Sequence, residues 1–301
     1  MTDSSSNTPS HLSGYVQGLR HRPQFWRTLV AAVSGILTLV VVLGVAAIPV
    51  GQAADRLIGI TPFDPANPSF TVGFWAAGNV LVALLIPVSM VLHKLVYGAS
   101  PGALTSVTGR FRWMLLARAS VVVLPVWVAY AVIMQPFLGT GLPKWTTVNL
   151  VLCVVALVTI PLQSAGEEYL FRGLIFRAIG ARFARPVVSL AVATAVTALQ
   201  FGLIHGATDP WGVAYYVVMG IGFAVLAERT GGLEVPILIH AANNTLLLVP
   251  VVLAGELATV STPTGSIVLV PMLLVATVTC VVWKLAPWLT APARRREEVA
   301  V

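Results

Sequence analysis

The sequence predicts an all-α protein, a polytopic membrane helical bundle of about eight transmembrane helices with cytoplasmic N- and C-termini. Hydrophobic residues make up 57% of its 301 residues and charged residues 10%, whereas soluble domains carry roughly 25% charged residues. The apolar residues gather in runs long enough to cross a bilayer as helices, which takes about 20 residues. Basic residues lie mainly between alternate runs, as orientation in a membrane requires.

Eight apolar runs are the candidate spans. In order, they cover residues 28–50, 70–93, 114–138, 146–163, 187–206, 211–227, 235–254 and 266–287. The fourth run is short and contains Pro161, and the arginine-rich stretch 164–185 that follows it has a helical pattern. If the N-terminus is cytoplasmic, only Arg56 and Lys144 of the 18 basic residues lie outside, which favours eight spans with both ends inside.

Three parts follow from this pattern. We expect a disordered, polar cytoplasmic tail over residues 1–27, a transmembrane domain over 28–290, and a basic cytoplasmic tail over 291–301. In a soluble protein, the net charge of +7 would indicate nucleic-acid binding. Here the basic residues lie at the ends of apolar runs, so the expected partner is the lipid bilayer and not nucleic acid.

Two adjacent carboxylates, Glu167 and Glu168, stand at the end of an apolar run in a chain with only 11 acidic residues. Charges at membrane depth are costly and are functional candidates by default. Ser164 and Glu167 fit the capping box S-x-x-E, which predicts a helix beginning at Ser164. On that helix Glu168 and Arg172 are placed for an i,i+4 ion pair. Glu167 is turned about 100° away, which leaves it free to act as a base.

Two histidines downstream also lie in apolar runs. Phe201 and His205 share one helix face, and so do His240 and Asn244, because each pair is four residues apart. Each histidine alone is more often a satisfied core residue. A buried imidazole beside a buried amide can donate hydrogen bonds to a developing oxyanion. A hairpin that turns near Arg185 would bring Glu167 and His205 to nearly the same level.

These residues form three ordered motifs, Glu167-Glu168…Arg172, Phe201…His205 and His240…Asn244. They resemble the EExxxR, FxxxH and HxxxN motifs of the intramembrane CAAX-protease and bacteriocin-processing family (CPBP, or Abi) over residues 146–254, the expected catalytic core. The resemblance implies an intramembrane endopeptidase in which Glu167 and His205 activate water. It further implies that His240 and Asn244 form the oxyanion site, while Glu168 and Arg172 hold the helix in place.

Two alternatives stay open from the sequence. Glu167, His205 and His240 are a plausible zinc set, although H-E-x-x-H is absent, so we expect no cofactor and keep zinc as the competing version. Intramembrane carboxylates and histidines also serve proton relays, so a non-catalytic membrane scaffold, a transporter or a bacteriocin-immunity protein is the alternative function. The expected partner is a peptide or protein tail, and the expected location is the cell membrane, multi-pass, in a bacterial inner membrane.

Overall fold

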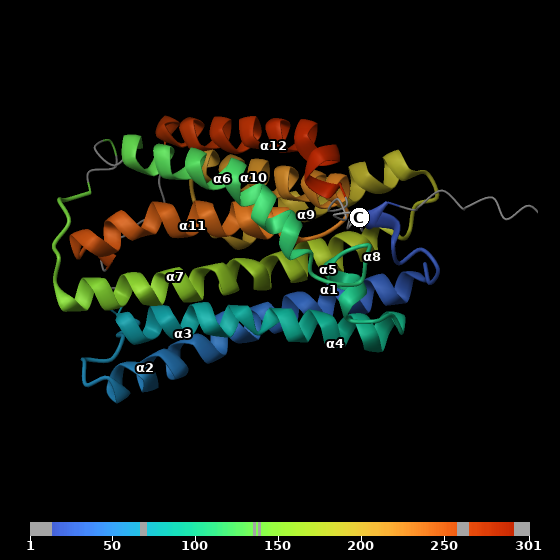
Figure 1. Cartoon of the computed structure of the whole chain (residues 1–301). Helices are drawn as coiled ribbons and strands as arrows, with labels where there is room; N and C mark the ends of the chain where they lie inside the picture. Colours follow the sequence, from blue (N-terminus) through green and yellow to red (C-terminus); the bar gives the residue numbers. More distant parts are fainter. Residues whose placement is uncertain (1–13, 67–70, 135–136, 138–139, 258–264, 292–301) are drawn as a thin grey trace, which may run out of the picture.

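The computed structural model describes residues 14–66, 71–134, 137, 140–257 and 265–291, and its named elements within them are all helices (Figure 1). Apart from one isolated bridge between Ser106 and Gly232, these residues form no β-structure. Within these described ranges, eight helical segments are long and apolar enough to cross a membrane. The described part of the chain therefore confirms the predicted all-α bundle.

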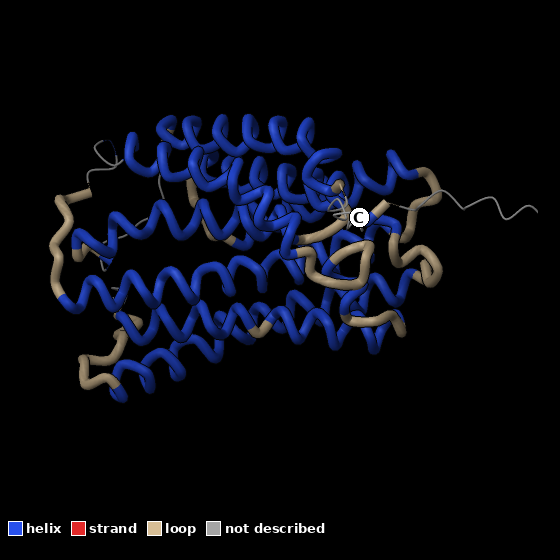
Figure 2. The backbone as a smooth tube through the Cα atoms, viewed as in Figure 1, coloured by secondary structure: helices blue, strands red, loops and turns tan. Residues whose placement is uncertain are grey.

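The spans follow the predicted runs closely. Their elements are α1 Phe25–Val40, η2 Val41–Ala46 and α2 Ala47–Leu57; α3 Val72–Ala83 and α4 Leu85–Tyr97; α6 Trp113–Met134; α7 Thr147–Glu168, η4 Tyr169–Ile175 and α8 Phe176–Gly180; α9 Pro186–Ile204; α10 Pro210–Thr230; α11 Glu234–Ala254; and α12 Leu269–Thr290. Shorter elements are η1 Tyr15–Gln17, α5 Gly102–Thr105 and η6 Ser266–Val268. Figure 2 shows many of the connecting loops towards the two ends of the bundle.

Helices α7 and α11 form the centre of the bundle. They pack on one another, and α7 also packs on α3 while α11 packs on α6. Helix α10 lies between α9 and α12, and α1 packs on α4. Large apolar side chains such as Leu95 and Val121 remain exposed on the outer surface, which is expected where lipid replaces water around a membrane bundle.

Two glycines allow close helix contacts near Glu167 and Arg172. A Cβ added to Gly166 would lie 2.2 Å from the carbonyl oxygen of Val82, so only glycine lets α7 approach α3 this closely. A Cβ at Gly220 would lie 2.7 Å from the Cα of Ala198, where α10 meets α9. Small residues at helix interfaces have this role in membrane proteins.

The predicted helix start at Ser164 is wrong. Residues 147–180 form one continuous 34-residue helical segment, in which α7 runs through Ser164 into η4 and α8. Ser164 is buried inside the helix and donates a hydrogen bond to the side chain of Gln163 instead of capping a terminus. Pro161 is accommodated within α7. At 1.5 Å per residue the segment is about 50 Å long, well beyond the roughly 30 Å hydrocarbon layer.

The N-terminal segment differs from the expected disordered tail where it is described. Tyr15, Val16 and Leu19 are fully buried. The backbone N–H of Val16 donates to Glu228, and Arg177 donates to the carbonyl of Tyr15. Apolar side chains within a polar stretch thus seat residues 14–19 against the bundle. Residues 1–13 and 292–301, the rest of the two expected tails, lie outside the described residues.

The two ends of the inner helices lie at different levels. Phe201 of α9 contacts Phe223 of α10 and His240 of α11, with ring centroids 6.3 and 5.7 Å apart. From this level α10 ends seven residues later at Thr230, about 10 Å away, while α9 begins 15 residues earlier at Pro186, about 22 Å away. The hairpin turn between α8 and α9 therefore projects roughly 10 Å past the α10–α11 turn (Figure 1).

Candidate active site

A π-helical segment follows directly after the paired carboxylates. Helix α7 ends at Glu168, and η4 continues without a break from Tyr169 to Ile175. Arg172 lies within this segment and is fully buried. Such π-helical turns are rare and occur frequently at functional sites. Here the turn carries the arginine that faces the carboxylates.

Glu168 is fully buried and makes two polar contacts through one oxygen. Its Oε1 accepts a hydrogen bond from Arg172 at 2.9 Å, so the predicted i,i+4 ion pair is present. The same oxygen lies 2.8 Å from Nδ1 of His240. Glu168 thus orients His240 as well as pairing with Arg172, a contact that the sequence spacing did not predict.

Arg172 is enclosed by aromatic rings. Its guanidinium lies 4.3 Å from the ring centroid of Phe201 and 5.1 Å from that of Phe223. Cation–π attraction is strongest where water is excluded, and this guanidinium is fully buried. Phe201 also packs edge-on against Phe171 and His240. It is therefore the apolar centre around which the charged groups are arranged.

Glu167 lies on the adjacent face and is 8% exposed. One carboxylate oxygen, Oε1, accepts a hydrogen bond from the side-chain amide of Gln163. The other, Oε2, is buried and has no hydrogen-bond partner among the described residues. It lies 4.0 Å from Nε2 of His205 and 3.8 Å from Nε2 of His240. The predicted levelling of Glu167 with His205 is confirmed, and His240 reaches the same oxygen.

His205 is held in one tautomer at the end of α9. Its Nδ1 lies 2.6 Å from the carbonyl oxygen of Phe201, which accepts the Nδ1–H. Nε2, which faces Glu167, is therefore left as an acceptor when the ring is neutral. The ring stacks on Tyr216 with centroids 3.9 Å apart. His205 lies one residue beyond the spanning segment, where burial lowers its pKa below the usual value and the nearby Glu167 carboxylate opposes that shift.

Asn244 lies one helical turn after His240 on α11 and is half-buried. Its Oδ1 accepts a hydrogen bond from the side chain of the neighbouring Asn243 at 3.1 Å. The structure thus brings together most of the predicted set directly, whereas the hydrogen bond of Asn244 is to Asn243. The residues in direct mutual contact are Glu167, Glu168, Arg172, Phe201, His205 and His240.

Gln163 is a residue of this cluster that the motifs did not identify. It precedes Glu167 by four residues on α7, so it shares a helix face with that carboxylate. Ser164 donates to its Oε1, which leaves its amide N–H to Glu167. An i,i+4 search around Glu167 would have found it, because the same spacing revealed the pair of Glu168 and Arg172.

The candidate zinc ligands Glu167, His205 and His240 are spaced more widely than the ligands of a tetrahedral zinc ion. Zinc–nitrogen and zinc–oxygen bonds of about 2.1 Å place two tetrahedral ligands about 3.4 Å apart. The distances from Glu167 Oε2 to the two Nε2 atoms are 4.0 and 3.8 Å. Among the described residues, no group of three or more His, Cys, Asp or Glu side chains has the geometry to hold a metal ion. We therefore derive no catalytic step through a metal.

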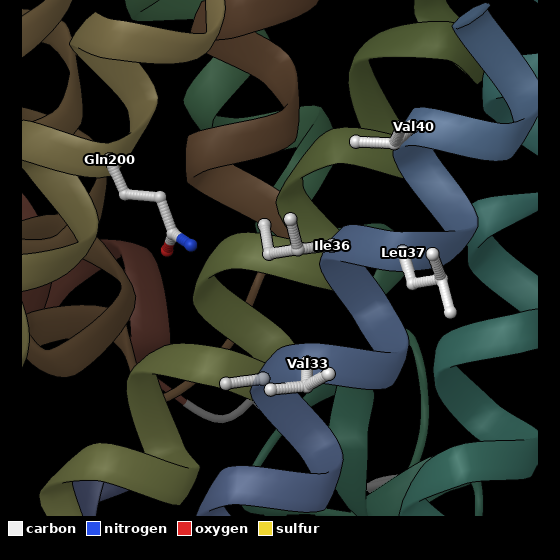
Figure 3. A pocket seen from close by; sticks show the side chains of 6 residues that line it. Val33, Ile36, Leu37, Val40 and Gln200 are labelled. Atoms are coloured by element: carbon white, nitrogen blue, oxygen red, sulfur yellow. The ribbon is translucent and has the colours of Figure 1, made fainter.

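A separate groove of about 410 Å³ lies between α1 and α9 (Figure 3). Its walls are apolar except for Gln200, whose Oε1 is buried without a hydrogen-bond partner among the described residues. Figure 3 shows Gln200 opposite the α1 side chains Val33 and Ile36. The groove offers no acid or base, so the candidate chemistry rests with the cluster around Glu167.

Comparisons with known proteins support the family resemblance. Residues 145–246 match the family model described as type II CAAX prenyl endopeptidase Rce1-like. Over 102 residues the chain is 29% identical to the uncharacterized protein YyaK of Bacillus subtilis (strain 168), which corresponds to 32% of this chain and 33% of that protein. The chain therefore spans about a third of the length of this curated relative. No solved structure matches the chain. The matched segment contains all three motifs, so this part of the chain is similar to the CAAX-protease family.

Proposed function

We propose that this chain, whose residues 145–246 match the family model described as type II CAAX prenyl endopeptidase Rce1-like, is an intramembrane endopeptidase that hydrolyses a peptide bond with a glutamate- and histidine-activated water. One observation carries the proposal. A buried carboxylate oxygen of Glu167 has no hydrogen-bond partner among the described residues and faces Nε2 of both His205 and His240. A buried acceptor without a donor is costly, and a water molecule supplies the donor that it needs.

The geometry between Glu167 and His205 suits one bound water. A water about 2.8 Å from each acceptor spans their 4.0 Å separation at an angle of roughly 90°, close to the angle between its two O–H bonds. Both O–H groups are then directed at acceptors, and an oxygen lone pair is left for the substrate carbonyl carbon. Glu167 takes one proton as the new C–O bond forms. Glu167 or His205 returns it to the amine nitrogen when the C–N bond breaks.

His240 and Asn244 are assigned to the oxyanion. Nδ1–H of His240 is used on Glu168, so Nε2 can donate only when the ring is doubly protonated. Donors held in place before the charge develops are worth about 10²–10³ in rate each. The side-chain N–H groups of Asn244 supply the second donor.

The proposed substrate is a peptide or protein tail that reaches the site from the membrane. The family description names prenylated CAAX sequences, so a prenylated tail is one form to test and an unprenylated tail is the other. We place the protein in the cell membrane of a bacterium as a multi-pass protein, with both termini on the cytoplasmic side.

Two internally quenched peptides in proteoliposomes test the proposal. One carries a farnesylated CAAX terminus, and its partner has the same sequence without the lipid. The wild-type protein is expected to cleave at least one of them, and Glu167→Gln to cleave neither. The matched control is Glu256→Gln, two residues past the far end of α11, which should retain the wild-type rate.

A second readout covers a substrate that differs from both peptides. Peptides recovered from membranes that hold the wild-type protein are compared with those from membranes that hold Glu167→Gln. Products that appear only with the wild-type protein support a protease. Identical peptide sets together with two uncut reporters overturn it, and an activity that disappears when the proton gradient is dissipated identifies a transporter instead. Cleavage that survives strong chelators supports the metal-free form, and loss restored by zinc would contradict it.

A further inference from the structure

A hydrogen-bonded relay of three side chains leads to Asn244 from outside the proposed catalytic set. The hydroxyl of Tyr215 on α10 donates to Oδ1 of Asn243 on α11 at 3.0 Å. The amide of Asn243 donates in turn to Oδ1 of Asn244 at 3.1 Å. Tyr215 is 8% exposed and Asn243 is 4% exposed, so solvent does not compete for the first of these bonds, while the second lies at the half-buried Asn244. None of the three sequence motifs includes Tyr215 or Asn243.

The direction of this relay decides what Asn244 can do. A side-chain amide has one oxygen that accepts and one nitrogen that donates. When Tyr215 donates, Asn243 presents nitrogen to Asn244, and Asn244 receives that bond on its oxygen. The two N–H groups of Asn244 then remain for a ligand. In the reverse direction Asn244 would spend a donor on Asn243, and its oxygen would turn towards the site, where it would repel a developing oxyanion.

We propose that Tyr215 is a positioning residue that, through Asn243, fixes the amide of Asn244 with its N–H groups available to the oxyanion. The proposal rests on the proposed function, because it requires Asn244 to contact the reacting carbonyl oxygen. Tyr215 itself does not touch the substrate. Its hydroxyl is the fixed donor at the start of the chain, and without it the buried Oδ1 of Asn243 loses its partner and both amides are free to rotate by 180°.

The two consecutive tyrosines of α10 thereby serve opposite sides of the site. Tyr216 stacks on His205, which faces the water, while Tyr215 reaches the relay that ends at Asn244. Their rings lie 5.2 Å apart. One turn of α10 therefore supports both the attacking side and the oxyanion side of the proposed reaction.

A double-mutant cycle on a reporter peptide that the wild-type protein cleaves tests the relay. Tyr215→Phe is expected to lower kcat about tenfold and to leave KM within about twofold, because the transition state loses an aligned donor while the ground state does not. Asn244→Ala should lose about 10²–10³ in kcat. The double variant should be no slower than Asn244→Ala alone, since Tyr215 acts only through Asn244.

Independent losses that multiply in the double variant would overturn the relay, as would a wild-type rate in Asn244→Ala. The matched control is Tyr130→Phe, which changes another buried tyrosine, on α6, and should stay within about twofold of wild type. If Tyr215→Phe does not fold, Asn243→Leu removes the middle of the relay and should show the same dependence on Asn244. Failure of the relay leaves the protease proposal intact as long as the wild-type protein cleaves and Glu167→Gln does not.

Discussion

Two buried carboxylates, Asp55 near the end of α2 and Glu167 near the end of α7, sit in contrasting surroundings. Both oxygens of Asp55 are used: Oδ2 accepts from the backbone of Phe63 and from Thr71, and Oδ1 accepts from the backbone of Gly73. Glu167 has one satisfied oxygen and one that faces two imidazoles without a donor. Burial and charge are shared by the two residues. They differ in their hydrogen bonds: both oxygens of Asp55 hold a loop in place, whereas one oxygen of Glu167 is left available for chemistry.

The largest expected effect on the rate comes from a substitution that moves the Glu167 carboxylate away from the two histidines and keeps its negative charge. Glu167→Asp draws the carboxylate back by one methylene, about 1.5 Å, from His205 and His240. Misplacement by about 1 Å can cost 10²-fold in rate, so we expect kcat to fall at least that far at an unchanged melting temperature. Reporter cleavage and thermal unfolding are measured together, with Glu256→Asp as the control. A near-wild-type rate would show that the position of this oxygen is unimportant.

The reciprocal change should affect stability and not rate. Asp55→Asn replaces an acceptor oxygen by an NH₂ group that faces hydrogen-bond donors, and a buried group left unsatisfied costs about 1–3 kcal/mol. The apparent melting temperature should drop by several degrees, with kcat within about twofold of wild type. Asp64→Asn, on an exposed aspartate of the same loop, is the control and should change little. A large loss of kcat in Asp55→Asn would contradict the idea that Asp55 contributes to stability and Glu167 to the rate.

Acidic pH should act on the Glu167 region through His205. Only the neutral ring presents Nε2 as an acceptor to the proposed water, so kcat/KM should fall as pH drops through the pKa of His205. Because burial lowers that pKa, the fall is expected below the ordinary histidine value of about 6.5. Initial rates in proteoliposomes buffered alike on both sides measure it. An acid limb centred above that value would contradict the assignment of His205 as a neutral acceptor.

The smallest effect is expected at Gln163, which holds the satisfied oxygen of Glu167. Gln163→Ala frees the carboxylate to rotate, and we expect kcat to fall by about three- to tenfold with KM unchanged, which corresponds to the roughly 0.5–1.5 kcal/mol of one hydrogen bond. Gln52→Ala is the matched control, because Gln52 donates to Phe63 in the loop that Asp55 fastens. A similar loss of kcat in both variants would make Gln163 merely structural.

Periodic features of the sequence predicted most of the fold. Apolar run length located the eight spans, and i,i+4 spacing located the ion pair of Glu168 and Arg172. A capping pattern failed at Ser164, because a membrane helix can continue through a local cap signal when its backbone has no water to turn towards. The burial of Tyr15 and Val16 was missed because a few apolar residues in a polar stretch carry no periodic signal.

The site was predictable only as far as spacing within one helix allows. The i,i+4 spacing predicted the ion pair of Arg172 with Glu168. The hairpin geometry predicted that His205 lies level with Glu167. The contact of His240 with Glu168 depends on how α11 crosses α7, which no local pattern encodes. The reach of Tyr215 to Asn243 depends in the same way on the packing of α10 against α11.

His240 lies about 10 Å beneath the α10–α11 turn. This depth determines how much of a helical substrate must unwind before it can be cleaved. A peptide bond can be attacked only when its backbone is extended, and a membrane helix that unwinds at mid-depth would expose N–H and C=O groups to hydrocarbon at several kcal/mol each. Near a helix end, the last few residues of a chain are already frayed and wet. The proposed reaction at this depth therefore favours loose chain ends over intact spans as substrates.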